Sequence, residues 1–425
     1  MTSAPPPEPV PAIRLPWVRA FALGRIFAVL GMQTLLVAVG WQLYERTESA
    51  WALGLVGVFE LIPVLLLFVP VGHLVDRSPR RRIAMFAHAL LGLASLGFLA
   101  TTAADAPLWW TWALLVVVGV ARAFAAPSVG TILPQLLDPL QFAHANAWMS
   151  AAFQVASVAG PVVSGALIDA TGDARAAFVA GAVGQAVFLL CLLRVPKPPV
   201  PTVVGGGRGL AALFAGFSFV RRTPVFLAAI TLDLFAVLLG GATALLPMFA
   251  KDVLRVGATE LGWLRAAPGL GALVTAIAIT RMAPWRRPGR VLLAAVTGFG
   301  VATVGFGLSR SLALSLACLF LTGLFDGVSV VVRMTLEQMV TPDALRGRVA
   351  AVKFVFIGMS NELGGFESGA VAAAFGPVAS VVIGGVGTLL VVAAVASKWP
   401  ALARIGPLAT LRPADDAAPA PPASG

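Results

Sequence analysis

The chain has 425 residues, of which 59% are hydrophobic and 12% charged, and its formal net charge is +11. Its mean hydropathy is +0.92. A soluble domain of this size could not hide so much apolar surface, so the composition excludes a soluble globular protein and indicates a helical membrane protein. The basic residues lie in short connections between apolar runs, which favours membrane orientation and anionic lipid over nucleic-acid binding. Cys191 and Cys318 both fall inside apolar runs, so neither a disulfide nor a metal cluster is predicted.

Twelve apolar runs recur along the chain, each about 20 residues long and therefore able to cross roughly 30 Å of hydrocarbon as a helix. The predicted spans are 19–43, 51–72, 83–104, 108–134, 146–168, 175–193, 225–250, 260–282, 291–308, 312–336, 350–373 and 378–396. With the N-terminus inside, 21 of the 30 Lys and Arg residues face the cytoplasm and five lie in outer loops. The predicted fold class is therefore an all-α membrane protein with twelve transmembrane helices and both chain ends in the cytoplasm.

An internal repeat divides the twelve spans into two halves. Gln135 and Pro139 recur at one common offset as Gln338 and Pro342. This repeat predicts two pseudo-symmetric six-helix bundles, with the substrate site between them near the membrane midplane. The predicted domains are a disordered cytoplasmic tail (1–16), the first bundle (17–194), a cytoplasmic linker with an amphipathic helix (195–224), the second bundle (225–397) and a second disordered cytoplasmic tail (398–425).

A basic turn separates the second and third predicted spans. It reads Gly72-His73-Leu74-Val75-Asp76-Arg77-Ser78-Pro79-Arg80-Arg81-Arg82. So many arginines in a short turn place it in water on the cytoplasmic side. The pattern resembles the loop between helices 2 and 3 of the major facilitator transporters, G-x-L-a-D-r-x-G-r-k, with Pro79 where that family usually has Gly. The resemblance implies a cytoplasmic gate, whereas a bare topology signal is the alternative. The gate residues would be Gly72, Asp76, Arg77, Arg80 and Arg81.

The fifth predicted span carries a second motif, Gly160-Pro161 followed by Ser164-Gly165. It resembles the helix-5 motif G-x-x-x-G-P-x-x-G-G of exporters in the same superfamily, particularly proton antiporters. Gly160, Pro161 and Gly165 match that motif. Small residues allow helices to approach closely and a proline permits a bend, so packing alone is the alternative explanation. The resemblance favours export.

Further stretches resemble one branch of the superfamily, the enterobactin-exporter-like branch, which also includes macrolide efflux proteins. The similarity extends over residues 15–400. The matching stretches include Trp41-Gln42-Leu43-Tyr44-Glu45-Arg46-Thr47, Leu133-Pro134-Gln135-Leu136 and Ser360-Asn361-Glu362-Leu363-Gly364.

Ionisable groups at membrane depth are candidates for ion or substrate coupling, because each is costly there unless it is paired or hydrated. Asp326, Arg333 and Glu337 fall on one face of the tenth predicted span. They form either a self-neutralised stripe or, at Asp326, a coupling or substrate group with Arg333 as its charge partner. Glu337 lies near the end of the span and is interpreted as structural.

Two further carboxylates lie deep in predicted spans, Asp233 in the seventh and Glu60 in the second. Asp233 either takes up and releases a proton during a transport cycle or is fixed in a pair with an arginine on another helix. Glu60 either has a coupling role or makes an interfacial or cross-bundle hydrogen bond. Glu362, in the eleventh predicted span, is a further coupling candidate.

Arg25 in the first predicted span and Arg122 in the fourth are candidate charge partners for these acids. Arg122 also resembles the helix-4 arginine of facilitator transporters, R-x-x-x-G, which is linked to proton transfer. The candidate cavity residues are Gln33, Asn361 and Phe235.

No nucleotide-binding pattern G-x-x-x-x-G-K-[ST] is present, so transport would draw on an ion gradient or on the gradient of the substrate. The sequence predicts a secondary exporter, not an enzyme, for an amphiphilic small molecule such as a drug, siderophore or lipid-like compound. Proton-coupled antiport by alternating access is the expected mechanism. An uptake symporter of the same fold and a non-transporting receptor or scaffold are the alternatives. We expect a monomer in the bacterial inner membrane whose partners are the substrate, protons and membrane lipids, with no metal, cofactor or nucleic acid.

Overall fold

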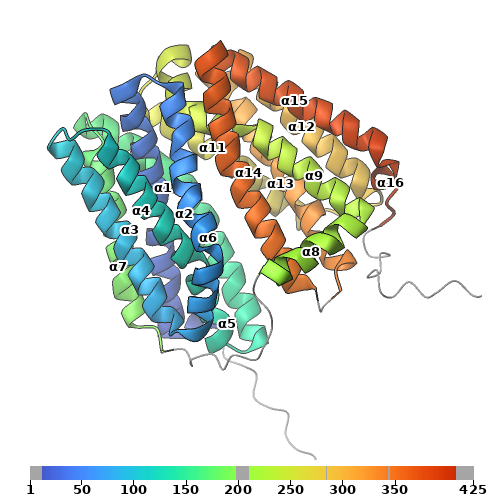
Figure 1. The fold of residues 1–425 in the computed structure, drawn as a ribbon, viewed down its shortest axis with the longest axis horizontal. Coiled ribbons are helices and arrows are strands. Elements are labelled where there is room, and N and C mark those ends of the chain that lie inside the picture. The colour runs from blue at the N-terminus through green and yellow to red at the C-terminus, as the bar shows by residue number, and fades with distance from the viewer. Residues whose placement is uncertain (1–11, 198–209, 284, 343–344, 408–425) are drawn as a thin grey trace, which may run out of the picture. The chain divides into compact units, whose positions relative to one another are not determined.

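A computed structural model describes residues 12–197, 210–283, 285–342 and 345–407 (Figure 1). These residues form helices and their connections, and no strand occurs among them. The helices are α1 (Pro16–Thr47), α2 (Ala50–Arg77), α3 (Arg80–Ala103), α4 (Trp109–Val129), α5 (Ile132–Leu136), α6 (Pro139–Thr171), α7 (Arg175–Leu193), α8 (Leu210–Arg222), α9 (Pro224–Leu239), α10 (Leu246–Met248), α11 (Ala258–Ile279), α12 (Pro288–Leu308), α13 (Leu312–Val340), α14 (Arg346–Phe375), α15 (Pro377–Lys398) and α16 (Pro400–Ala403), with the short elements η1 (Ala12–Arg14), η2 (Gly241–Leu245) and η3 (Phe249–Leu254).

Parts of the predicted tails and linker lie outside the described residues. These parts are 1–11, 198–209 and 408–425, and they include the glycine-rich portion of the linker. The linker helix itself is present as α8, which packs on α14 and exposes Phe214 and Phe217.

Eleven helices in the described parts of the chain are long and apolar enough to cross a membrane. The remaining long helix is α14, which coincides with the predicted span 350–373. Asn361, Glu362 and Glu367 interrupt its apolar run, and it is not one of the eleven. The helical membrane fold is therefore confirmed, whereas the count of twelve spans and the orientation of the chain ends stay predictions.

The predicted seventh span, 225–250, falls within Pro224–Leu254, which is one of the eleven, but its helix is not regular throughout. α9 ends at Leu239, and the chain continues through η2, α10 and the π-helix η3. Gly240 and Gly241 mark the break, because glycine is about 1 kcal/mol less favourable than alanine inside a helix. A Cβ on Gly241 would also overlap the backbone of Gly364 in α14, so η2 approaches α14 more closely than any larger residue would allow.

The described chain clusters into two compact units. The first unit is Met1–Arg46, Phe59–Gly205 and Val256–Ala266, and the second is Thr47–Val58, Gly206–Arg255 and Ala267–Gly425. Two helices are divided between them: the first turns of α2 belong to the second unit, and the first turns of α11 belong to the first.

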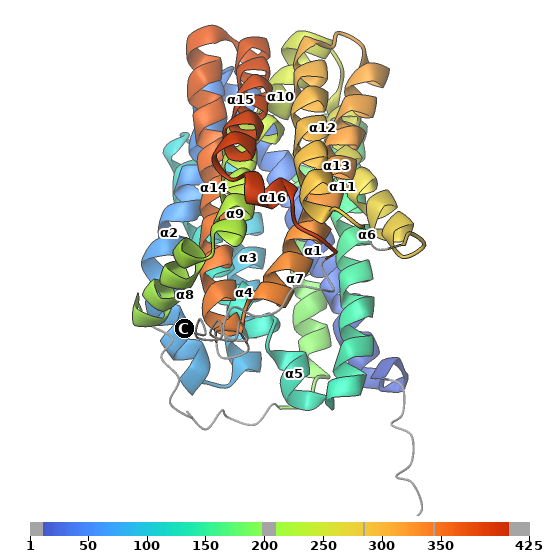
Figure 2. The same ribbon diagram turned by 90° about the vertical axis from the view of Figure 1, so that its right-hand side faces the viewer.

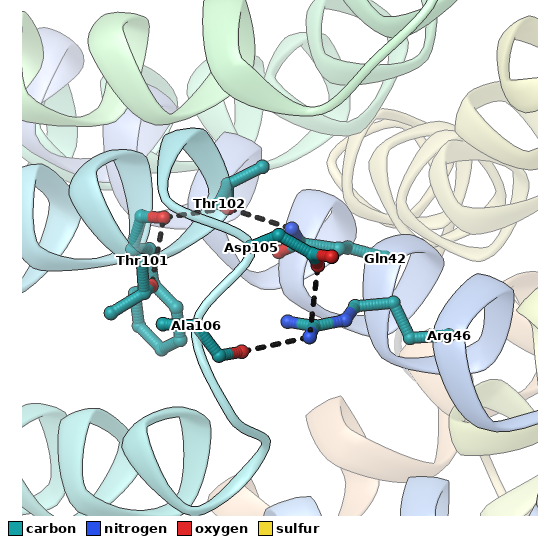
Figure 3. A network of polar contacts seen from close by, with 7 residues as sticks. Gln42, Arg46, Thr101, Thr102, Asp105 and Ala106 are labelled. Carbon is teal, nitrogen blue, oxygen red and sulfur yellow. Dashed lines mark hydrogen bonds and ion pairs between the residues drawn. The ribbon is translucent and has the colours of Figure 1, made fainter.

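In the first unit, α3 packs against both α4 and α7 (Figure 1). A buried cluster that includes Phe21, Ile132 and Phe188 joins α1, α5 and α7. The end of α1 is tied to the end of α3 by polar contacts (Figure 3). Gln42 Nε2 donates to Thr102 Oγ1 at 2.6 Å, and Arg46 Nη2 donates to the Ala106 carbonyl at 2.8 Å.

In the second unit, α12 packs against α13 and α15. The short helix α16 lies beside α12 and α15 (Figure 2). The buried side chains of Leu232 from α9, Leu292 from α12 and Val332 from α13 form the centre of its core. This core holds α9 and α13 side by side, and both helices carry ionised residues.

Candidate functional site

The ionised groups of the second unit converge on Arg333 in α13. Its Nη1 forms an ion pair with the carboxylate of Asp233 on α9, and its Nη2 lies 3.7 Å from Asp326 Oδ1. Arg333 Nε also donates to the Ser329 carbonyl one turn earlier on α13, at 3.3 Å. The Arg333 and Asp233 side chains are 15% and 17% exposed, whereas that of Asp326 is 47% exposed. Arg333 is thus held firmly by one carboxylate and loosely by the other.

This geometry follows from helix spacing and from the packing of α9 on α13. Asp326 and Arg333 are seven residues apart, which places them two turns apart on one helix face. Asp233 follows Leu232, which is fully buried in the core that joins the two helices. Of the two predicted alternatives for Asp233, the structure shows a pair with an arginine on another helix.

Two cavities adjoin this group of three residues, which we call the Arg333 cluster. The first has a volume of 210 Å³ and is lined by both Asp233 and Asp326. The second has a volume of 240 Å³ and is lined by Asp233, Arg333, Glu337 and Lys353. Asp233 lines both, so the fixed ion pair lies where the two cavities adjoin.

A second ion pair lines the second cavity. Lys353 Nζ on α14 lies 2.5 Å from Glu337 Oε2 on α13. Sequence spacing placed Glu337 within pairing distance of Arg333, but Glu337 binds the lysine of a neighbouring helix. Lys353 was missed as a site residue, although it is a cation inside a predicted span and could have been found by the same criterion as the acids.

In the first unit, Arg122 on α4 forms an ion pair with Glu60 on α2. The Glu60 side chain is only 2% exposed. A Cβ on Gly119, one turn before Arg122, would overlap the Glu60 backbone, so the two helices are in very close contact at this point. Arg122 is therefore the partner of a buried acid, which is one of its two predicted roles. Its predicted link to proton transfer stays a prediction.

The other predicted residues of the first unit lie apart from that pair. Arg25 is half-buried in α1, close enough to His88 on α3 to interact with it electrostatically. His88 Nδ1 lies 2.7 Å from Gln185 Oε1. Gln33 packs on α6, where Gly160 leaves room for its side chain.

The remaining candidates of the second unit are only partly brought together. Asn361 lines the first cavity. Phe235 is 39% exposed and is not among the described residues that line either cavity. Glu362 lies against Gly57, in the part of α2 that belongs to the second unit, and not at the Arg333 cluster. Phe299 and Phe325 line the first cavity and were not predicted, because aromatic residues in an apolar span carry no distinguishing signal.

The basic turn between α2 and α3 makes contacts inside the first unit. Asp76 Oδ1 lies 3.8 Å from Arg80 Nη2, and Arg81 donates to the carbonyls of Leu193 and Val195 at 3.1 and 2.8 Å. Arg81 thus neutralises the carbonyl end of α7. Gly72 has open space where a Cβ would project. The gating role of this turn stays a prediction.

The helix-5 motif places α6 against two helices. Thr34 Oγ1 of α1 donates to the Gly160 carbonyl at 3.1 Å, and Ser164 Oγ donates to the Thr34 carbonyl at 2.9 Å. At Gly165, a Cβ would overlap the backbone of Ala258, where α11 begins. Pro161 meets α11 one turn further along, at Gly262. The motif therefore provides close helix contacts, and its link to export stays a prediction.

Apolar helices long enough to span a bilayer, ion pairs between those helices and a cavity lined by carboxylates are typical of a multi-pass membrane protein of the transporter class. The chain belongs to the Major Facilitator Superfamily, whose profile matches residues 21–365. Membership, similarity to bacterial exporters and eleven described helices that are long and apolar enough to span a membrane make it a multi-pass protein of the bacterial inner membrane.

Similar proteins agree with this assignment. The Enterobactin exporter EntS of Shigella boydii is 28% identical over 380 residues, which cover 88% of this chain and 90% of that one. The protein of the same name from Escherichia coli has the same identity and coverage. A bacterial homologue of the human lysosomal transporter Spinster superposes with a TM-score of 0.72 at 16% identity, over 93% of this chain and 98% of that one. The nucleoside transporter NupG gives a TM-score of 0.68 at 14% identity, over 91% and 99%. These two structures share the fold.

Proposed function

We propose that the protein exports an amphiphilic small molecule in exchange for protons, by alternating access. Membership of the Major Facilitator Superfamily supports transport, and similarity to proteins named as enterobactin exporters supports the outward direction. The observation that carries the coupling proposal is the unequal hold on Arg333. Asp233 binds it in a pair whose side chains are partly buried, whereas Asp326 lies 3.7 Å away and is 47% exposed.

The charges of the Arg333 cluster explain why Asp326 is the exchangeable group. When Asp326 is protonated, Arg333 and Asp233 still neutralise each other and the cluster carries no net charge. When Asp326 is ionised, the cluster carries one negative charge beside the first cavity. Asp326 can therefore gain or lose one proton while Arg333 and Asp233 stay paired. Neither Arg333 nor Asp233 is then left as an isolated charge, which would be costly at membrane depth.

The other charged groups have supporting roles in this proposal. Asp233 fixes the orientation of Arg333, and Glu60 with Arg122 fixes α2 against α4 in the first unit. Asp76 and Arg80, whose side chains lie 3.8 Å apart, hold the turn between α2 and α3 in one conformation of the transport cycle.

Everted membrane vesicles test this function. Respiration acidifies their lumen, and an exporter then accumulates substrate in exchange for luminal protons, so a dye that reports the pH gradient responds when substrate is added. We expect a response from the wild type and none from Asp326→Asn. The matched control is Asp173→Asn, because Asp173 is not among the described residues that line either cavity and pairs with nearby Arg175 at 3.1 Å. Proton-driven accumulation that persists in Asp326→Asn would refute the coupling role, and accumulation that requires an alkaline lumen would indicate uptake.

A further inference from the structure

The first cavity of the second unit has acidic walls, which bears on the charge of the substrate. Its described lining residues include two carboxylates, Asp233 and Asp326, and no basic side chain. Arg333 neutralises one of these carboxylates from outside the lining, through its pair with Asp233. The second cavity differs, because its described lining contains two acidic and two basic residues and is balanced. The first cavity therefore favours a positively charged ligand, whereas the second favours neither sign of charge.

Three neutral polar residues of the first cavity present acceptor oxygens to a ligand. Thr303 Oγ1 donates to the Phe299 carbonyl at 2.9 Å, and Thr322 Oγ1 donates to the Leu319 carbonyl at 2.6 Å. Asn361 Nδ2 donates to the Ile357 carbonyl at 3.0 Å. The two threonine hydroxyl hydrogens are thus used within their own helices, so these hydroxyls offer oxygen lone pairs to a ligand. Asn361 offers its amide oxygen and its second N–H.

Aromatic rings complete the lining. Phe299 packs against Gly240, where a Cβ would come within 2.8 Å of the ring, and Phe325 packs against Gly298 at 2.7 Å. Glycine at these two positions leaves room for the rings beside neighbouring helices, and the close contact restricts their movement. Aromatic faces attract cations and repel anions, because the ring quadrupole is negative at its face.

We propose that the substrate is a lipophilic amine cation, whose protonated nitrogen donates to Asp326 in the first cavity while its apolar part lies against Phe299 and Phe325. This inference rests on the proposed export function and adds the charge of the substrate to it. The negative charge, the free acceptor oxygens and the aromatic faces all favour a positively charged donor. An anion of the same size would meet like charge and unpaired acceptors.

Three compounds with one apolar cage separate charge from hydrophobicity: adamantylamine, adamantanol and adamantane carboxylate. Their binding to the detergent-purified full-length protein is measured by calorimetry at neutral pH, where the amine is a cation. We expect the amine to bind about tenfold or more tightly than the alcohol, since a charge-assisted hydrogen bond contributes about 1.5–3 kcal/mol. The carboxylate is expected to bind more weakly than the alcohol.

Variants of the cavity locate the binding. Asp326→Asn should abolish the preference for the amine, while Asp326→Glu keeps it. Asn361→Asp adds a third carboxylate to the lining of the same cavity and should strengthen amine binding, which provides a gain of affinity that misfolding cannot imitate. Asp105→Asn is the control, because the Asp105 side chain is 95% exposed and lies far along the chain from the cavity residues.

Equal binding of the three compounds, tighter binding of the carboxylate, or no binding of the amine would each overturn the inference. So would an unchanged preference in Asp326→Asn. The vesicle experiment distinguishes failure of the amine inference from failure of the proposed export function. If neutral or anionic compounds drive proton release in everted vesicles, export stands and the amine inference is lost. If the amine binds and no compound drives proton exchange, the binding site stands and export is lost.

Discussion

Glu60 and Arg122 form an ion pair whose two members differ sharply in exposure. The Glu60 carboxylate is 2% exposed, whereas the Arg122 side chain is 38% exposed. The buried acid therefore depends on the arginine more than the arginine depends on the acid, since water can solvate the guanidinium but not the carboxylate.

This asymmetry predicts unequal effects of the two single substitutions. Arg122→Met should lower the free energy of unfolding by about 2–4 kcal/mol, because it leaves a charged carboxylate buried without its cation. Glu60→Gln should cost about 1 kcal/mol or less, because the guanidinium remains partly hydrated. Thermal unfolding of the detergent-purified variants measures both.

The double variant Glu60→Gln/Arg122→Met is the control for this prediction. It removes the buried charge together with its partner, so its stability should exceed that of Arg122→Met alone. If Glu60→Gln proved the more damaging single change, the burial argument would be wrong.

Gly160 sets the distance between α1 and α6. A Cβ at this position would lie 2.5 Å from Gln33 Cβ and 2.9 Å from the Leu30 carbonyl oxygen. Gly160→Ala should therefore push the helices apart and lengthen the two hydrogen bonds that link Thr34 to α6. We expect a lower unfolding temperature and a loss of about 1–3 kcal/mol, as for other overpacked interiors.

Gly92→Ala is a matched control for Gly160→Ala. Gly92 also lies within a long helix, α3, but the nearest atom to its Cβ would be Gln185 Cβ at 3.5 Å, an ordinary contact. This variant should be as stable as the wild type or slightly more stable, because alanine favours the helix. Equal tolerance of both substitutions would argue against close packing at Gly160.

The sequence was sufficient to locate most helices but not to pair their charges. The predicted span 175–193 coincides with α7 because its ends carry clear signals, a basic residue at each side of an apolar run. Arg333 shows what helix spacing alone cannot predict. Helix spacing names Asp326 and Glu337 as its neighbours, because spacing describes one helix at a time. Its tightest partner is Asp233 on α9, which only the packing of two helices could reveal.

The irregular helix of the seventh span could not be predicted for the same reason, since it also depends on contacts between helices. Gly240 and Gly241 are small and apolar enough to fit a continuous span, and glycine is common in transmembrane helices. After α9 ends, η2 approaches the backbone of Gly364, which lies more than a hundred residues later and cannot be predicted from the sequence of this span. Similarly, the Phe299 and Phe325 rings became site residues only when a cavity showed which face of each helix they occupy.

Asp76 tests whether the turn between α2 and α3 acts as a gate. Its carboxylate lies 3.8 Å from Arg80 and is 25% exposed, so Asp76→Asn should cost less than about 1 kcal/mol of stability. We nevertheless expect transport in everted vesicles to fall to a small fraction of the wild-type rate, with unchanged membrane insertion. Asp138→Asn, before α6, serves as the control. Normal transport by Asp76→Asn would leave the turn with a topological role alone.

The ion pair between Glu337 and Lys353 joins α13 to α14 and can be tested by exchanging its charges. Lys353→Glu alone places two carboxylates together where the Glu337 side chain is 13% exposed and the lysine 30% exposed. Two like charges that are mostly shielded from water repel each other strongly. This variant should therefore lose about 1–3 kcal/mol of stability. The double variant Lys353→Glu/Glu337→Lys restores one charge of each sign and should recover most of the loss, because the attraction between the two groups is unchanged when they exchange places. Thermal unfolding of the wild type, Lys353→Glu, Glu337→Lys and the double variant gives the coupling energy directly. A value near zero would show that the two helices are held together by apolar packing and not by this pair.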